Sequence, residues 1–176
     1  MRQRRRRAAR SHRGLVLPFH QNPVIPTSSR TFSADAAREH LIAVYRTYPA
    51  LEGARQAVRT IIESVALGRT VLVHCSAGKD RTGWAVAAAL RAAGVVEDAI
   101  EADYLRSNDA VEDLRAMLAR RYPDADIPAD YLGVHTEYLR AADEAMIDAH
   151  GDPAGYLAAC GVDADTLARY RERVVV

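Results

Sequence analysis

The chain has 176 residues, of which 49% are hydrophobic and 27% charged, enough for one domain with a hydrophobic core. No run approaches the roughly 18 apolar residues of a membrane-spanning helix. The stretch "GLVLPFHQNPVIP" is too short and too interrupted by proline for the core of a signal peptide. We therefore predict a cytoplasmic protein, with export without a cleavable signal left open. Its two cysteines, Cys75 and Cys160, predict neither a disulfide framework nor a metal site, and no cofactor is expected.

The charge is distributed unevenly behind a net value of +1. Residues 1–34 hold eight arginines and no acid, whereas all 23 acidic residues follow from Asp35 onward against 16 basic ones. A basic arm that binds nucleic acid or an anionic membrane is one interpretation, and an unstructured tail is the other. Because the arginines lack interleaved aromatic residues, we favour a disordered arm over residues 1–30 without a nucleic-acid partner.

Hydrophobic spacing and capping residues predict helices along the rest of the chain. Ser33 can cap the first helix, Gly68 and Gly94 can end later ones, and Asp152 and Asp163 can cap the last two. The expected helices cover about residues 34–48, 51–67, 82–93, 98–106, 109–121, 135–149, 152–160 and 163–174.

One strand is expected, at residues 71–74, where an unbroken apolar run is typical of a strand buried on both faces. Such a strand needs neighbours for its backbone hydrogen bonds, and only "GLVLPF" offers another, weakly. The predicted fold is therefore α/β, with a central, mostly parallel sheet flanked by helices, incomplete at its N-terminal side, and a helix-rich C-terminal half.

The loop after this strand carries the chemistry of the chain, in the sequence "VLVHCSAGKDRTG". A strand, a tight loop and a helix N-terminus together direct backbone N–H groups and a helix dipole at an anion. Cys75 would lose its proton readily there, and Arg81 can bind two oxygens of a phosphate. Ala77 and Gly78 allow close backbone approach, and Thr82 can donate a hydroxyl to the sulfur.

Lysine usage also points to this loop. The protein has 23 arginines and one lysine, and that lysine is Lys79. A flexible ammonium suits a point-charge contact with an anionic group, so we expect Lys79 to face the substrate, although one residue does not exclude chance.

"HCSAGKDRTG" resembles the signature loop of cysteine-dependent tyrosine phosphatases, specifically the bacterial tyrosine and dual-specificity group that also acts on phosphoinositides. The resemblance extends over roughly residues 36–176. It implies that Cys75 is the nucleophile that forms a phosphocysteine, that Arg81 clamps the phosphate and that Asp80 transfers protons. His74 would tune the thiolate and Thr82 would assist its departure. The substrate-binding residues that it implies are His74, Ser76, Ala77, Gly78, Lys79 and Thr82.

The family's N-terminal strands have no counterpart in residues 1–30, which raises the expectation of a truncated or mis-started phosphatase. We expect a partial phosphatase domain at residues 31–176 that hydrolyses phosphotyrosine or phosphoserine proteins or phosphoinositides. The alternatives are an inactive phosphate-binding module, a fragment of a phosphatase and, less favoured, a rhodanese-like sulfurtransferase, which would not need the His-Cys start. The sequence is silent on the oligomeric state.

Overall fold

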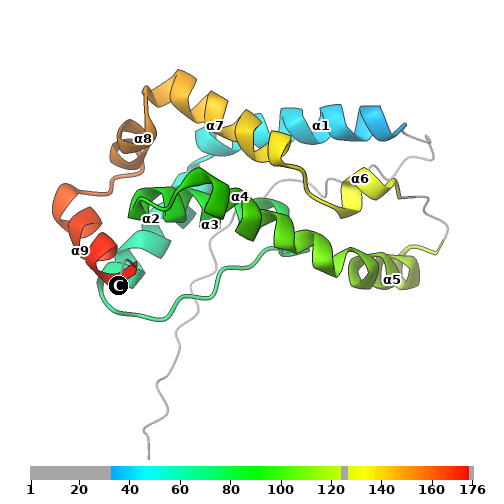
Figure 1. The fold of residues 1–176 in the computed structure, drawn as a ribbon, viewed down its shortest axis with the longest axis horizontal. Coiled ribbons are helices and arrows are strands. Elements are labelled where there is room, and N and C mark those ends of the chain that lie inside the picture. Colours follow the sequence, from blue (N-terminus) through cyan, green and yellow to red (C-terminus); the bar gives the residue numbers. More distant parts are fainter. Residues whose placement is uncertain (1–32, 124–126, 175–176) are drawn as a thin grey trace, which may run out of the picture.

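The computed structural model describes residues 33–123 and 127–174, and this part of the chain is built from helices (Figure 1). Nine are α-helices, and two short 3₁₀ helices, η1 and η2, lie between them. The elements are α1 (Ala34–Thr47), η1 (Tyr48–Ala50), α2 (Glu52–Ala66), α3 (Asp80–Ala93), α4 (Glu97–Leu105), η2 (Arg106–Ala110), α5 (Val111–Arg121), α6 (Ala129–Leu132), α7 (Thr136–His150), α8 (Pro153–Ala159) and α9 (Ala164–Val174).

The helix termini follow the local signals in the sequence. The Ser33 hydroxyl accepts a hydrogen bond from the Ala36 N–H at 3.2 Å and begins α1. The carboxylates of Asp152 and Asp163 cap α8 and α9 in the same way, each accepting a backbone N–H at 2.7 Å. Gly94 ends α3 with φ 87°, a left-handed conformation that favours glycine. The expected helices are therefore confirmed, including those of the C-terminal half; the short α6 was not expected.

The helix that follows the signature loop begins earlier than the expected residue 82. Its first residue is Asp80, so both Asp80 and Arg81 lie in the first turn of α3. Both side chains therefore extend from the first turn of a helix that lies next to the loop, and the site residues from Asp80 onward belong to α3.

The core forms where α1 packs along α7, α2 packs on α9, and α3 lies against α2, α4 and α9 (Figure 1). Alanines line the buried side of α3, so neighbouring helices approach it closely. Trp84 of this helix is buried, and its ring meets Tyr48 and Tyr156 at centroid distances of 5.7 and 6.2 Å. This packing anchors the first turns of α3, which directly follow the signature loop.

The expected strand at residues 71–74 is wrong. These residues run without regular secondary structure between α2 and α3, along the edge of the helical body in Figure 1. Leu72 is 86% exposed, whereas a strand buried on both faces would cover it. No other described segment pairs its backbone with residues 71–74, and an extended segment without a hydrogen-bonded neighbour does not become a strand.

The expected α/β fold with a central parallel sheet is contradicted for the same reason. Residues 33–123 and 127–174 contain no strand and no sheet. The apolar run at 71–74 has the local composition of a strand, but sheet formation depends on partners distant in sequence. The second predicted strand, "GLVLPF", and the basic arm at residues 1–30 lie outside the described residues.

None of the helices in the described part of the chain combines the length and the apolar character needed to cross a membrane.

Candidate active site

The signature loop bends back on itself immediately before α3. Gly78 adopts φ 76°, a left-handed conformation, and its backbone N–H donates a hydrogen bond to the Cys75 Sγ at 3.2 Å. An N–H directed at sulfur favours the thiolate over the thiol. The loop thus places a backbone donor on the nucleophile that the sequence predicts.

The pKa of Cys75 lies below that of an ordinary thiol. Partial burial of the side chain raises this pKa and is the largest single effect. Three residues together lower it by more: Thr82 through its hydroxyl and backbone N–H, Gly78 through its N–H, and Arg81 through its charge. The Thr82 hydroxyl is buried and makes no hydrogen bond of regular geometry within the described residues, so it acts on the sulfur as a nearby dipole. A thiolate near neutral pH is a strong nucleophile.

Arg81 reaches back over the loop from the first turn of α3. Its Nη2 donates to the Ser76 Oγ at 3.0 Å, which spans the loop from its end to its start. The guanidinium is also near enough to Cys75 to lower the thiol pKa by its positive charge. A planar cation beside the sulfur can hold the oxygens of a phosphoryl group that the sulfur attacks.

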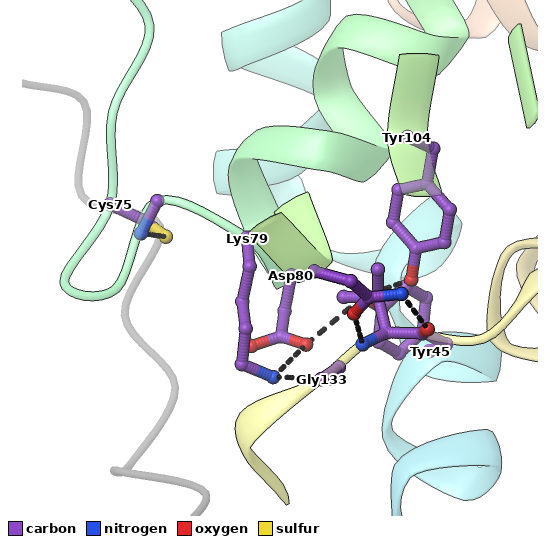
Figure 2. Close-up of polar contacts among 9 residues, drawn as sticks. Tyr45, Cys75, Lys79, Asp80, Tyr104 and Gly133 are labelled. Carbon is purple, nitrogen blue, oxygen red and sulfur yellow. Dashed lines mark hydrogen bonds and ion pairs between the residues drawn. The ribbon is translucent and has the colours of Figure 1, made fainter. Parts of the chain in front are cut away.

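Lys79 is oriented differently from the expected direct contact with substrate. The side chain is buried, and its Nζ donates to the Asp80 Oδ1 at 2.9 Å and to the Gly133 carbonyl at 3.1 Å. Figure 2 shows the side chain running from the loop toward Gly133, apart from Cys75. The ammonium therefore connects the loop to the segment before α7, and in this structure its charge is already paired.

Asp80 belongs to a chain of polar groups that extends into the core. The Tyr45 hydroxyl donates to the Asp80 Oδ1 at 3.1 Å, and the oxygens of Tyr45 and Tyr104 lie 2.8 Å apart (Figure 2). Only 14% of the Asp80 side chain is exposed. The carboxyl group that the sequence suggests for proton transfer is thus held by Tyr45 and by its neighbour Lys79.

The remaining predicted residues are at the surface of the loop. His74, Ser76, Ala77 and Gly78 are exposed, and Cys75 and Thr82 are partly buried below them. The structure therefore brings Cys75, Ser76, Gly78, Arg81 and Thr82 together around the sulfur. His74 lies before the bend and is exposed to solvent. Lys79 points away from the sulfur, toward Asp80.

Several residues at the site were not predicted from the sequence as functional. Tyr45, Tyr104 and Gly133 complete the network around Asp80. Tyr48 also lies near the site. Burial is the largest cause of its raised pKa, and the charges of Asp80, Arg81 and Cys75 act on it as well. Hydrophobic spacing predicted the first helix, but no local signal indicated which polar group the side chain of Tyr45 would meet.

Asn108, in η2, supports the network from outside. Its side chain accepts the Val134 N–H at 2.7 Å and donates to the Val134 carbonyl at 3.0 Å. These bonds fix the strip that presents the Gly133 carbonyl to Lys79. Among the described residues, no group of three or more His, Cys, Asp or Glu side chains is arranged to hold a metal ion.

Known proteins of one family match this chain. A model described as the tyrosine phosphatase family matches residues 3–176. The triple specificity protein phosphatase PtpB of Mycobacterium tuberculosis is 41% identical over 152 residues, which cover 78% of this chain and 55% of that protein. A Cupriavidus necator protein assigned as a tyrosine-protein phosphatase is 36% identical over 121 residues, which cover 66% of this chain and 44% of that protein.

The chain spans about half the length of these curated relatives. The family resemblance inferred from the signature loop is confirmed by the match of the family model to nearly the whole sequence. The chain belongs to the tyrosine phosphatase family.

Proposed function

We propose that this protein hydrolyses phosphomonoesters through a phosphocysteine intermediate on Cys75. The observation that carries the proposal is the environment of the sulfur, whose pKa is lowered by Thr82, Gly78 and Arg81 against the opposing effect of burial. Family membership supports the same chemistry. No metal ion or organic cofactor is required for it.

In the first step the Cys75 thiolate attacks phosphorus, and the bond from phosphorus to the leaving oxygen breaks. The electron pair goes to that oxygen, which takes a proton from Asp80. Arg81 and the loop N–H groups stabilise the charge on the other phosphoryl oxygens. In the second step water attacks phosphorus, the S–P bond breaks, and Asp80 takes the proton from the water.

The substrates that we propose are phosphotyrosine and phosphoserine proteins or phosphoinositides. The name of PtpB, a triple specificity phosphatase, supports a range wider than one class. Turnover of a phosphotyrosine peptide, a phosphoserine peptide and a vesicle-borne phosphoinositide, measured side by side by phosphate release, would rank them. The cytoplasmic location stays a prediction, to be checked by cell fractionation.

Turnover of p-nitrophenyl phosphate tests the central claim, with Cys75→Ser and Cys160→Ser measured beside the unaltered chain. We expect loss of turnover in Cys75→Ser and retention in Cys160→Ser, because the second thiol is buried at the end of α8 and is not part of the signature loop. Acid quenching during turnover should trap a phosphoryl adduct on the peptide that contains Cys75. A cooperatively folded chain that binds phosphate without turnover would contradict hydrolysis and favour an inactive phosphate-binding module.

A further inference from the structure

Two hydrogen bonds converge on one oxygen of Asp80. Its Oδ1 accepts from the Tyr45 hydroxyl at 3.1 Å and from the Lys79 Nζ at 2.9 Å. The other oxygen, Oδ2, takes part in none of the hydrogen bonds between the described residues, and the side chain retains 14% exposure. The carboxyl group is thus oriented with one oxygen engaged inward and the other available for proton transfer.

The direction of the hydrogen bonds follows from the number of protons. The Tyr45 hydroxyl has one proton and donates it to Asp80, so Tyr104 must be the donor in the 2.8 Å contact between the two tyrosines. The result is a relay of donors from Tyr104 to Tyr45 to Asp80, shown in Figure 2. Burial, followed by the negative charge of Asp80, raises the pKa of Tyr45, which therefore remains a neutral donor.

Tyr45 is also rigidly placed. Its side chain is fully buried, and its ring packs at centroid distances of 4.8 Å from Tyr48 and 5.5 Å from Tyr138. A donor that is fixed by its own packing can orient a neighbouring side chain, because the donor loses no further conformational entropy when the hydrogen bond forms. The Tyr45 hydroxyl meets these requirements for holding Asp80.

We infer that Tyr45, supported by Tyr104, is a positioning residue that aims the Asp80 carboxyl at the leaving oxygen of the substrate. The inference rests on the proposed function, since it assigns a role within that reaction. In this role Tyr45 touches neither phosphate nor sulfur and acts through Asp80. It belongs to α1, distant in sequence from the signature loop, so helix packing determines how well the acid is aimed.

The leaving group distinguishes positioning from a general loss of structure. A proton from Asp80 matters greatly when the leaving oxygen is a poor one, as in phenyl phosphate, and little when it is a good one, as in p-nitrophenyl phosphate. We expect Tyr45→Phe to lower kcat/KM for phenyl phosphate about 10-fold, and for p-nitrophenyl phosphate by less than about 3-fold. A structural defect would lower both alike and overturn the inference.

Tyr138→Phe is the matched control. Tyr138 is equally buried and packs on the Tyr45 ring, but its hydroxyl makes no hydrogen bond within the described residues. We expect this variant to keep kcat/KM for both substrates within about 2-fold. Equal effects of Tyr45→Phe and Tyr138→Phe would contradict a specific role for Tyr45. Thermal melts identify a variant that fails to fold. If Tyr45→Phe fails to fold, Tyr104→Phe replaces it, because this change removes only the hydroxyl that donates to Tyr45. We expect it to lower kcat/KM for phenyl phosphate by a smaller factor, again with little effect on p-nitrophenyl phosphate.

A double-mutant cycle identifies the group through which Tyr45 acts. If Tyr45 works through Asp80, Tyr45→Phe adds no further loss for phenyl phosphate once Asp80→Asn is in place. Additive losses would overturn the inference while leaving the proposed function intact, provided that turnover still depends on Cys75. A chain without Cys75-dependent turnover would overturn both proposals together, so the two failures are distinguishable.

Discussion

The backbone N–H of Gly78 donates to the Sγ of Cys75 at 3.2 Å, and Gly78 itself has φ 76°. This N–H belongs to the peptide that joins Ala77 to Gly78, and the left-handed φ turns the chain from that peptide toward α3. Any other residue would be strained there, by roughly 1–2 kcal/mol. The acidity of the thiol is thus coupled to the conformation of one glycine three residues away.

Gly78→Ala is therefore expected to raise the thiol pKa and to slow alkylation of Cys75 by iodoacetamide at pH 7. An added Cβ would meet nothing within 4 Å, so the effect comes from backbone strain rather than from a clash. Gly94→Ala is the matched control, since Gly94 has φ 87° and equally open surroundings but lies at the far end of α3. Equal alkylation rates in the two variants would contradict the coupling.

The two cysteines are expected to differ sharply in reactivity. Burial raises the pKa of Cys160, which is only 7% exposed, whereas the pKa of Cys75 is lowered despite its burial. Brief treatment with iodoacetamide at pH 7 should modify Cys75 alone, as measured by peptide mass spectrometry. The rate should rise with pH to a plateau reached below the ordinary thiol range. Faster labelling of Cys160 in the folded chain would contradict the structure.

Asn108→Ala should destabilise the fold by about 2 kcal/mol. Val134 is buried, and the substitution leaves both its N–H and its carbonyl without the partners that Asn108 provides at 2.7 and 3.0 Å. Urea unfolding measures the change, and Asp109→Ala, at the exposed neighbouring position, serves as control. An unchanged midpoint in Asn108→Ala would mean that these two bonds contribute nothing to stability.

Asp143 should make the stability depend on pH. Burial, only partly offset by Arg91 and reinforced by Glu97 and Glu101, raises its pKa to about 7. The folded state therefore holds a proton that the unfolded state releases near pH 4. The contribution of Asp143 to the free energy of unfolding is fully present below about pH 4 and is lost as pH rises toward about 7.

Urea unfolding of the unaltered chain and of Asp143→Asn at pH 5 and pH 8 tests this dependence. The unaltered chain should lose on the order of 2 kcal/mol more than the variant between these two values. Groups present in both proteins, the histidines included, cancel in this difference. Parallel pH profiles would show that Asp143 does not titrate in this window.

Local signals in the sequence were sufficient for the helices and for the loop. Ser33, Gly94 and Asp152 mark helix ends through bonds that span a few residues, so their effect does not depend on the rest of the fold. The spacing of Cys75, Gly78 and Arg81 likewise places their groups around one point within a single turn and loop. These parts of the site were predictable because every contact in them is short in sequence.

The contacts around Lys79 and Asp80 were decided by tertiary structure. Lys79 binds the carbonyl of Gly133, 54 residues away, and Asp80 binds the hydroxyl of Tyr45, 35 residues away. The strand expected at residues 71–74 failed for the complementary reason, since no described segment pairs with it. Charge alone predicted that the single lysine would face the substrate, but the direction of a flexible side chain depends on which partners packing brings within reach. The sequence by itself thus determined the signature loop around Cys75, whereas the fold decided which groups hold the Asp80 carboxylate.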